Sequence, residues 1–208
     1  MNSNLVITIG RTFGSGGREI GKALAAELDM KYYDKEILAE AAKESGLDEK
    51  YISLFDEQKP SFNFFSSMAS GVLGDERQME VKLQTMQHQV IERIVTESPC
   101  VIIGRRADLL LKGRANTYSV FVSAPMEYCM KRVSVRDSLS ELESAEKIRR
   151  MNRKRKAFYN YTGEGKWGEA ANYDLCIDSS RLGTDGAVKL IMDYIDLCQK
   201  ARRCSSSL

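Results

Sequence analysis

Short apolar runs alternate with amphipathic segments along the chain. Apolar, β-branched runs predict strands buried on both faces at residues 5–9, 30–33, 100–103, 118–122 and 173–178. Apolar positions that recur every three or four residues predict helices that begin near Arg18 and helices at 76–97, 125–136, 140–161 and 183–202. Strands separated by helices indicate an α/β fold with a five-stranded, mainly parallel sheet and helices on both faces.

One long interval, residues 35–97, carries no strong strand pattern before its final helix. Short helices are expected at 36–44 and 48–55. Residues 58–74 read as a loop with aromatic side chains, which is either a hydrophobic plug or a mobile cover over a ligand. The 208 residues are enough for one domain with one core.

A glycine-rich loop follows the first predicted strand. Gly14, Ser15, Gly16 and Gly17 stand between that strand and the first helix. Glycines let the backbone approach a phosphate closely, and a helix N-terminus adds partial positive charge. The loop therefore predicts a phosphate site, and its alternative is a structural turn that binds nothing.

The loop departs from the phosphate-binding pattern G-x-x-x-x-G-K-[ST]. If Gly16 is the second glycine, Gly17 takes the lysine position and Arg11 takes the position of the first glycine. Arg18 and Glu19 follow where a Mg²⁺-binding hydroxyl is expected. Arg18 or Arg11 could supply the missing positive charge, and Glu19 could hold Mg²⁺, directly or through water.

The dinucleotide pattern G-x-G-x-x-G is a second interpretation of the same loop. Gly14 and Gly16 fit its first two glycines, but Glu19 occupies the third. Asp34 lies about 20 residues on, where a ribose-binding acid would sit. The match is partial.

Polar residues follow the carboxyl ends of the predicted strands, where open parallel sheets bind ligands. We therefore expect a spatial cluster of residues 10–17, Asp34, Arg105, Arg106 and Asp178.

The predicted helix at 140–161 is strongly basic, and Arg155 lies on or beside its apolar face. An inward arginine needs an anion, either a carboxylate or a phosphate. Arg132 and Arg136, on the preceding helix, are weaker candidates for the same cavity. The other basic residues of the run are expected to point mostly elsewhere: Arg149, Arg150, Arg153, Lys154 and Lys156.

Composition narrows the possible functions. A net charge of +2 gives no global basic field for a nucleic acid polymer. Five cysteines without a C-x-x-C pair, and one histidine, argue against zinc, and Cys100 and Cys176 are expected to be buried in strands. No leader or long apolar span is evident, so a cytoplasmic protein without membrane contact is expected. The oligomeric state stays open.

Taken in order, these segments resemble the cytidylate kinase-like family of P-loop nucleoside monophosphate kinases. Residues 7–24 are similar to the first strand, loop and helix of its divergent branch, which lacks the Walker lysine. Tyr32-Tyr33-Asp34 resembles the end of the family's second strand, and residues 35–97 match its monophosphate-binding insertion in position. Gly104-Arg105-Arg106 resembles the family's Gly-Arg-Asp motif. Residues 148–155 resemble the lid helix, within a lid region at 140–171, and residues 173–180 resemble the last strand and its exit.

The resemblance implies a single three-layer P-loop kinase domain that transfers phosphoryl groups from ATP to CMP or dCMP, with Mg²⁺. ATP would be held by Arg11, Gly14, Ser15, Gly16, Gly17, Arg18 and Glu19, with Glu19, or else Asp34, supporting the metal. The nucleotide acceptor would be bound by Asp34, Arg105, Arg106, Asn152 and Arg155, and the catalytic residues would be Arg18, Arg105 and Arg155. Asn152 stands where the family usually has aspartate.

Two alternatives stay open. A nucleotide-binding sensor that has lost catalysis would explain the absent lysine. A dinucleotide-binding oxidoreductase would explain the partial glycine pattern, but this hypothesis gives the basic helix no role.

Overall fold

The computed structural model describes residues 4–34, 37, 74–160 and 165–205. Within these residues, five strands form one parallel sheet in the order β2-β3-β1-β4-β5. The strands are β1 (Val6–Arg11), β2 (Lys31–Tyr33), β3 (Cys100–Ile103), β4 (Thr117–Ser123) and β5 (Leu175–Asp178). The predicted α/β class and the parallel sheet are confirmed.

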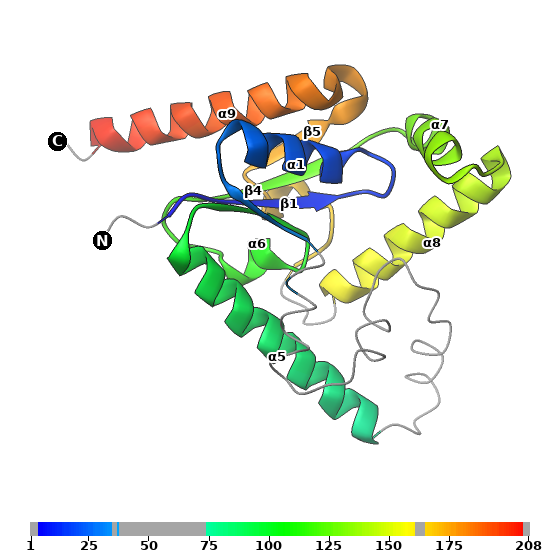
Figure 1. The fold of residues 1–208 in the computed structure, drawn as a ribbon, viewed down its shortest axis with the longest axis horizontal. Coiled ribbons are helices and arrows are strands. Elements are labelled where there is room, and N and C mark those ends of the chain that lie inside the picture. Colours follow the sequence, from blue (N-terminus) through cyan, green and yellow to red (C-terminus); the bar gives the residue numbers. More distant parts are fainter. Residues whose placement is uncertain (1–3, 35–36, 38–73, 161–164, 206–208) are drawn as a thin grey trace.

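The helices lie on both faces of the sheet and beyond its carboxyl edge (Figure 1). They are α1 (Gly17–Glu27), α5 (Gly74–Glu97), α6 (Ala107–Leu110), α7 (Met126–Asp137), α8 (Glu141–Asn160) and α9 (Ser179–Ser205), with a 3₁₀ turn at Ala170–Asn172. None of these helices is long and apolar enough to cross a bilayer. The helices expected at 36–44 and 48–55 and the loop expected at 58–74 fall outside the described residues, apart from Ile37 and Gly74.

Two apolar layers hold the helices on the sheet. On one face α1 and α9 pack on the strands, with Ile20, Leu24 and Ile191 almost fully buried. On the other face α5 and α6 pack around β3, where Ile91 and Ile102 are fully buried. β1 is central and all six of its residues are buried, so the glycine loop leaves the best-anchored strand of the sheet.

The sequence prediction was wrong for Cys176 and inexact for α9. Cys100 is fully buried, but Cys176 is exposed because β5 is an edge strand with one neighbour. Strand order cannot be read from an apolar run, so the two runs looked alike. α9 begins at Ser179, but the non-helical Gly183 (φ 65°) divides it into a first turn and a longer helix, and the longer helix starts where the sequence predicted.

Ser179, the first residue of α9, ties the end of β5 to the glycine loop. Its hydroxyl lies 2.6 Å from the carbonyl oxygen of Ser15 and 3.1 Å from that of Ser123. Ser15 in turn donates its own hydroxyl to the carbonyl oxygens of Thr12 (2.9 Å) and Val122 (3.1 Å). The back of the loop is therefore fixed by two buried serines.

Ser179→Ala should lower the free energy of unfolding by about 1–3 kcal/mol, because a buried carbonyl of the loop loses its donor. Urea unfolding would measure the change. Arg181→Ala, two residues along at a site whose side chain is 86% exposed, is the matched control and should leave stability unchanged. Equal stability of the wild type and Ser179→Ala would show that the hydrogen bonds of the Ser179 hydroxyl do not stabilise the loop.

Candidate functional site

The glycine loop joins β1 to α1 and presents backbone N–H groups at the carboxyl edge of the sheet. Gly14 (φ 87°) and Gly16 (φ 84°) adopt left-handed conformations that favour glycine. Gly16 precedes α1, and no side chain of the described residues caps this helix. The first N–H groups of α1 thus have no side-chain acceptor among the described residues, which leaves the predicted phosphate site a prediction.

A cavity of about 780 Å³ opens between this loop, α7 and α8. Among the described residues, its positively charged lining consists of Arg11, Arg18, Lys131, Arg132, Arg136, Lys147, Arg150 and Arg155, and its negatively charged lining of Glu19 and Asp137. This excess of positive charge in a concave site attracts a polyanion. Arg132 and Arg136 share the cavity with Arg155 as expected. Of the five basic residues expected to point mostly elsewhere, Arg150 is exposed but also lines this cavity, and the other four do not line it.

Phe13, which the sequence analysis did not single out, connects the loop to both helices of the cavity. The guanidinium carbons of Arg136 and Arg155 lie 4.9 and 5.4 Å from its ring centroid. The backbone N–H of Phe13 donates to Asn152 Oδ1 (2.8 Å), and Arg155 Nη1 donates to the carbonyl oxygen of Arg11 (3.0 Å). The signal available in the sequence was an aromatic residue beside the glycines.

Glu19, the predicted metal ligand, forms an ion pair with Arg132. No group of three or more histidine, cysteine, aspartate or glutamate side chains in the described part of the chain could hold a metal ion. A role for Glu19 toward Mg²⁺ therefore stays a prediction.

Asp34, at the end of β2, lies between two arginines. Arg18 Nε is 2.6 Å from Asp34 Oδ2, and Arg11 Nη2 is 3.9 Å from Asp34 Oδ1. Asp34 and Arg11 are only 4% and 6% exposed. The expected cluster at the strand ends is thus present, except that Asp178 accepts hydrogen bonds from Ser180 and lines neither cavity of the site.

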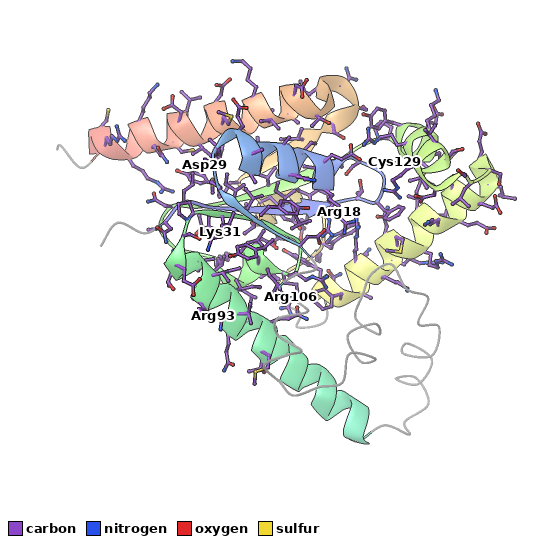
Figure 2. All side chains as sticks on the ribbon, viewed as in Figure 1. Arg18, Asp29, Lys31, Arg93, Arg106 and Cys129 are labelled. Carbon is purple, nitrogen blue, oxygen red and sulfur yellow. The ribbon has the colours of Figure 1, made fainter. Side chains whose placement is uncertain are left out.

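The turn after β3 is strained and basic. Gly104, Arg105 and Arg106 have successive φ values of 67°, 57° and 56°, a left-handed run that costs non-glycine residues roughly 1–2 kcal/mol each. Both arginines are 8% exposed. Arg105 makes no hydrogen bond or ion pair to any other residue that the structure describes. Figure 2 shows Arg106 and Arg18 toward the carboxyl edge of the sheet, with Asp29 and Lys31 at the opposite end.

A second cavity, of about 20 Å³, lies between this turn and the end of α8. Its lining includes Arg11, Arg105, Arg106, Arg155 and the aromatic pair Tyr159 and Tyr173. Tyr159 donates to Asp108 Oδ2 (2.5 Å), which fastens α8 to α6. Burial raises the pKa of Asp108, although the hydrogen bond from Tyr159 opposes the rise, and burial raises the pKa of Tyr173 to about 12.

Comparison with known proteins places this geometry among kinases. The model of the cytidylate kinase-like family matches residues 6–181. A cytidylate kinase of Methanocaldococcus jannaschii is 25% identical over 199 residues, covering 94% of this chain and 100% of that protein. A solved structure of an uncharacterized protein from Eubacterium ventriosum has a TM-score of 0.70 at 27% identity, covering 93% of this chain and 99% of that chain.

A gluconokinase from Sinorhizobium meliloti, 14% identical, has a TM-score of 0.57 and covers 99% of both chains. At this identity the likeness concerns the fold alone. Together with the strand order, it confirms the predicted three-layer α/β fold of P-loop kinase type.

Tyr159→Phe should destabilise the protein at neutral pH and much less in acid. The raised pKa of Asp108 means that folding favours its protonated form, so stability is lost as pH rises from about 3.9 through the folded pKa. The Tyr159 hydroxyl limits that loss, and its removal should cost about 1.5–3 kcal/mol at pH 7. Urea unfolding at pH 7 and pH 3.5 measures both values.

Tyr194→Phe is the control, because the ring of Tyr194 packs edge-on against Tyr118 rather than bonding a carboxylate. Its effect should be the same at both pH values. A Tyr159→Phe cost that does not change with pH would show that the hydroxyl does not act through Asp108.

Proposed function

The chain belongs to the cytidylate kinase-like family, and from this premise we propose that it transfers the γ-phosphoryl group of ATP to the phosphate of CMP or dCMP. Such a reaction asks little covalent work of the protein. It requires two nucleotides held in line and cations placed around the transferring group. The arrangement of the loop, the strand ends and α8 supports each requirement.

The observation that carries the proposal is the buried Arg105. A guanidinium with so little exposure and no counter-charge among the described residues costs several kcal/mol unless an anion binds it. It stands on a left-handed turn beside Arg106, and both line the small cavity together with Arg155. The phosphate of a nucleoside monophosphate supplies the missing charge, and arginine can grip it through two hydrogen bonds.

The donor is assigned to the larger cavity. The loop amides and the N-terminus of α1 would hold the phosphates of ATP, and the basic side chains of α7 and α8 would neutralise them. A Mg²⁺ ion bound with ATP would supply positive charge that offsets the charge of the phosphates. Glu19, beside the loop, is the residue that could orient water on that ion. Arg155 would act from α8 on charge that develops during transfer.

A sensor that binds nucleotide without turnover is the second candidate. Gly17 provides no lysine, and Asn152 and Arg155 already bond the loop backbone in this structure. The oxidoreductase alternative loses support, because dinucleotide-binding sheets have the strand order 3-2-1-4-5-6 whereas this sheet runs 2-3-1-4-5.

A panel of acceptors should separate the kinase from the sensor. With Mg²⁺ and ATP, CMP or dCMP should give ADP formation well above the rates with UMP, AMP or no acceptor. In a parallel thermal-shift series, a nucleotide at a hundredfold excess over its Kd should stabilise the fold by about 2.7 kcal/mol. ATP stabilisation without ADP formation from any monophosphate would favour the sensor, and no response to millimolar ATP would contradict both.

Arg105→Met should lower kcat/KM for CMP by roughly 10- to 100-fold while the KM for ATP stays near the wild-type value, because one charged contact to the acceptor is lost. The same variant should be as stable as the wild type or more so, since methionine replaces an uncompensated buried charge. Steady-state kinetics and urea unfolding check the two effects.

The exposed Arg149→Met, on α8 outside both cavities, is the control and should change neither kinetics nor stability. A large loss of stability in Arg105→Met would assign Arg105 to the fold instead of the acceptor.

A further inference from the structure

Gly17 stands where the phosphate-binding pattern has lysine, and the reason is steric. A Cβ atom at Gly17 would lie 2.6 Å from Arg11 Cβ and 3.3 Å from Val122 Cβ, and real Cβ contacts are not as short as the first of these. Arg11 itself stands where the phosphate-binding pattern has its first glycine. The two departures from the pattern are therefore coupled, because the side chain at position 11 leaves no room for a Cβ atom at position 17.

The side chain of Arg11 runs from the loop toward the ends of β2 and β3. This side chain is 7% exposed, and its Nη2 lies 3.9 Å from Asp34 Oδ1. A Cβ atom at Gly104 would overlap Arg11 Nη1, so the guanidinium rests directly on the turn that carries Arg105. The positive charge of Arg11, beside the loop assigned to ATP, thus lies against the turn assigned to the acceptor phosphate.

The two cavities meet at Arg11 and Arg155. Among the residues that the structure describes, these are the only two that line both cavities. A phosphoryl group that passes from a donor in the first to an acceptor phosphate beside the second would therefore pass near these two side chains. In a phosphate-binding loop with the usual pattern, the lysine supplies the positive charge at this place, because it reaches the β- and γ-phosphates.

Arg18 is placed differently. Its side chain is 48% exposed, its Nε is held 2.6 Å from Asp34 Oδ2, and it does not line the smaller cavity. It follows Gly17 in sequence and is the obvious substitute for the lysine, but its guanidinium is turned to the carboxylate at the end of β2.

We propose that Arg11, rather than Arg18, is the relocated cation of the loop and contacts the γ-phosphoryl group, and that Gly17 is a glycine because Arg11 fills its space. The assignment rests on the proposed function, since it presumes that ATP is the donor. In the transfer, the bond between the bridging oxygen of ATP and its γ-phosphorus breaks, and an oxygen of the acceptor phosphate bonds that phosphorus. ADP leaves with the bonding electrons, and Arg11 offsets charge without gaining or losing a proton.

Nucleotide binding tests the contact without turnover. Isothermal titration with ATP and with ADP, each with Mg²⁺, is measured for the wild type, Arg11→Met, Arg11→Lys and Arg18→Met. Arg11→Met should raise the Kd for ATP at least tenfold and the Kd for ADP by less than about threefold, because only ATP carries the γ-phosphate. Arg11→Lys should retain most of the preference for ATP, and Arg18→Met should leave the ratio of the two Kd values unchanged.

The outcomes separate the two proposals. A wild type that binds neither nucleotide overturns the proposed function, and this assignment with it. A wild type that binds ATP, with the same ratio of Kd values in Arg11→Met, overturns the assignment alone. A change of that ratio in Arg18→Met but not in Arg11→Met returns the role to Arg18.

Thermal unfolding tests, without any ligand, the claim that Gly17 is a glycine because Arg11 fills its space. Gly17→Ala should lower the Tm by about 5 °C in the wild-type background, because the new Cβ overlaps that of Arg11. The loss should be as large in an Arg11→Ala background, which keeps the Cβ, and much smaller in an Arg11→Gly background, which removes it. Gly186→Ala, at a helical glycine whose Cβ would lie 3.2 Å from Leu182 Cβ, is the control and should not lower the Tm. Equal losses in the Arg11→Ala and Arg11→Gly backgrounds would overturn the steric link.

Discussion

Buried positive charge at the carboxyl edge of the sheet is the constraint on which the rest of this structure depends. Arg11, Arg105 and Arg106 are each more than nine-tenths buried at the ends of β1 and β3. Of the buried carboxylates nearby, Asp34 is shared by Arg11 and Arg18, and Asp108 has a raised pKa and is occupied by Tyr159. Guanidiniums cannot lose their charge, so the edge keeps an excess that an anionic ligand would balance.

The scaffold makes this excess tolerable, because the central strand behind it is buried and paired on both sides. β1 is buried along its whole length and pairs with β3 and β4, and two serines fix the loop that follows it. Asn152 is uncharged, and this affects the electrostatic field in the larger cavity. It accepts the N–H of Phe13 as an aspartate would, but it brings no negative charge beside Arg155 and Arg136. The same hydrogen bond to an aspartate would tie α8 to the loop and weaken the field in the cavity.

The sequence predicted the sheet and the cluster at its edge because both follow from local patterns. Buried parallel strands are continuous apolar runs, and the carboxyl ends of parallel strands must meet, so Asp34, Arg11 and the 104–106 turn could be placed together. The sequence could not show the order of the strands, which decides that Cys176 is exposed, or that Arg150 lines the cavity. α6 was missed because four residues show no period. Phe13 and Tyr159 take their roles from partners more than 50 residues away.

The altered loop illustrates why a motif read position by position misleads. Read position by position, Gly17 stands where the pattern has lysine and Arg11 where it has glycine, which counts as two separate departures. In space, the Cβ atoms of these two positions compete for one volume, so a side chain at either position requires glycine at the other. The usual pattern and this one are then two solutions to one packing problem. In the solution found here the guanidinium of Arg11 extends from the end of β1 to the turn after β3, where Gly104 leaves the space that the guanidinium needs.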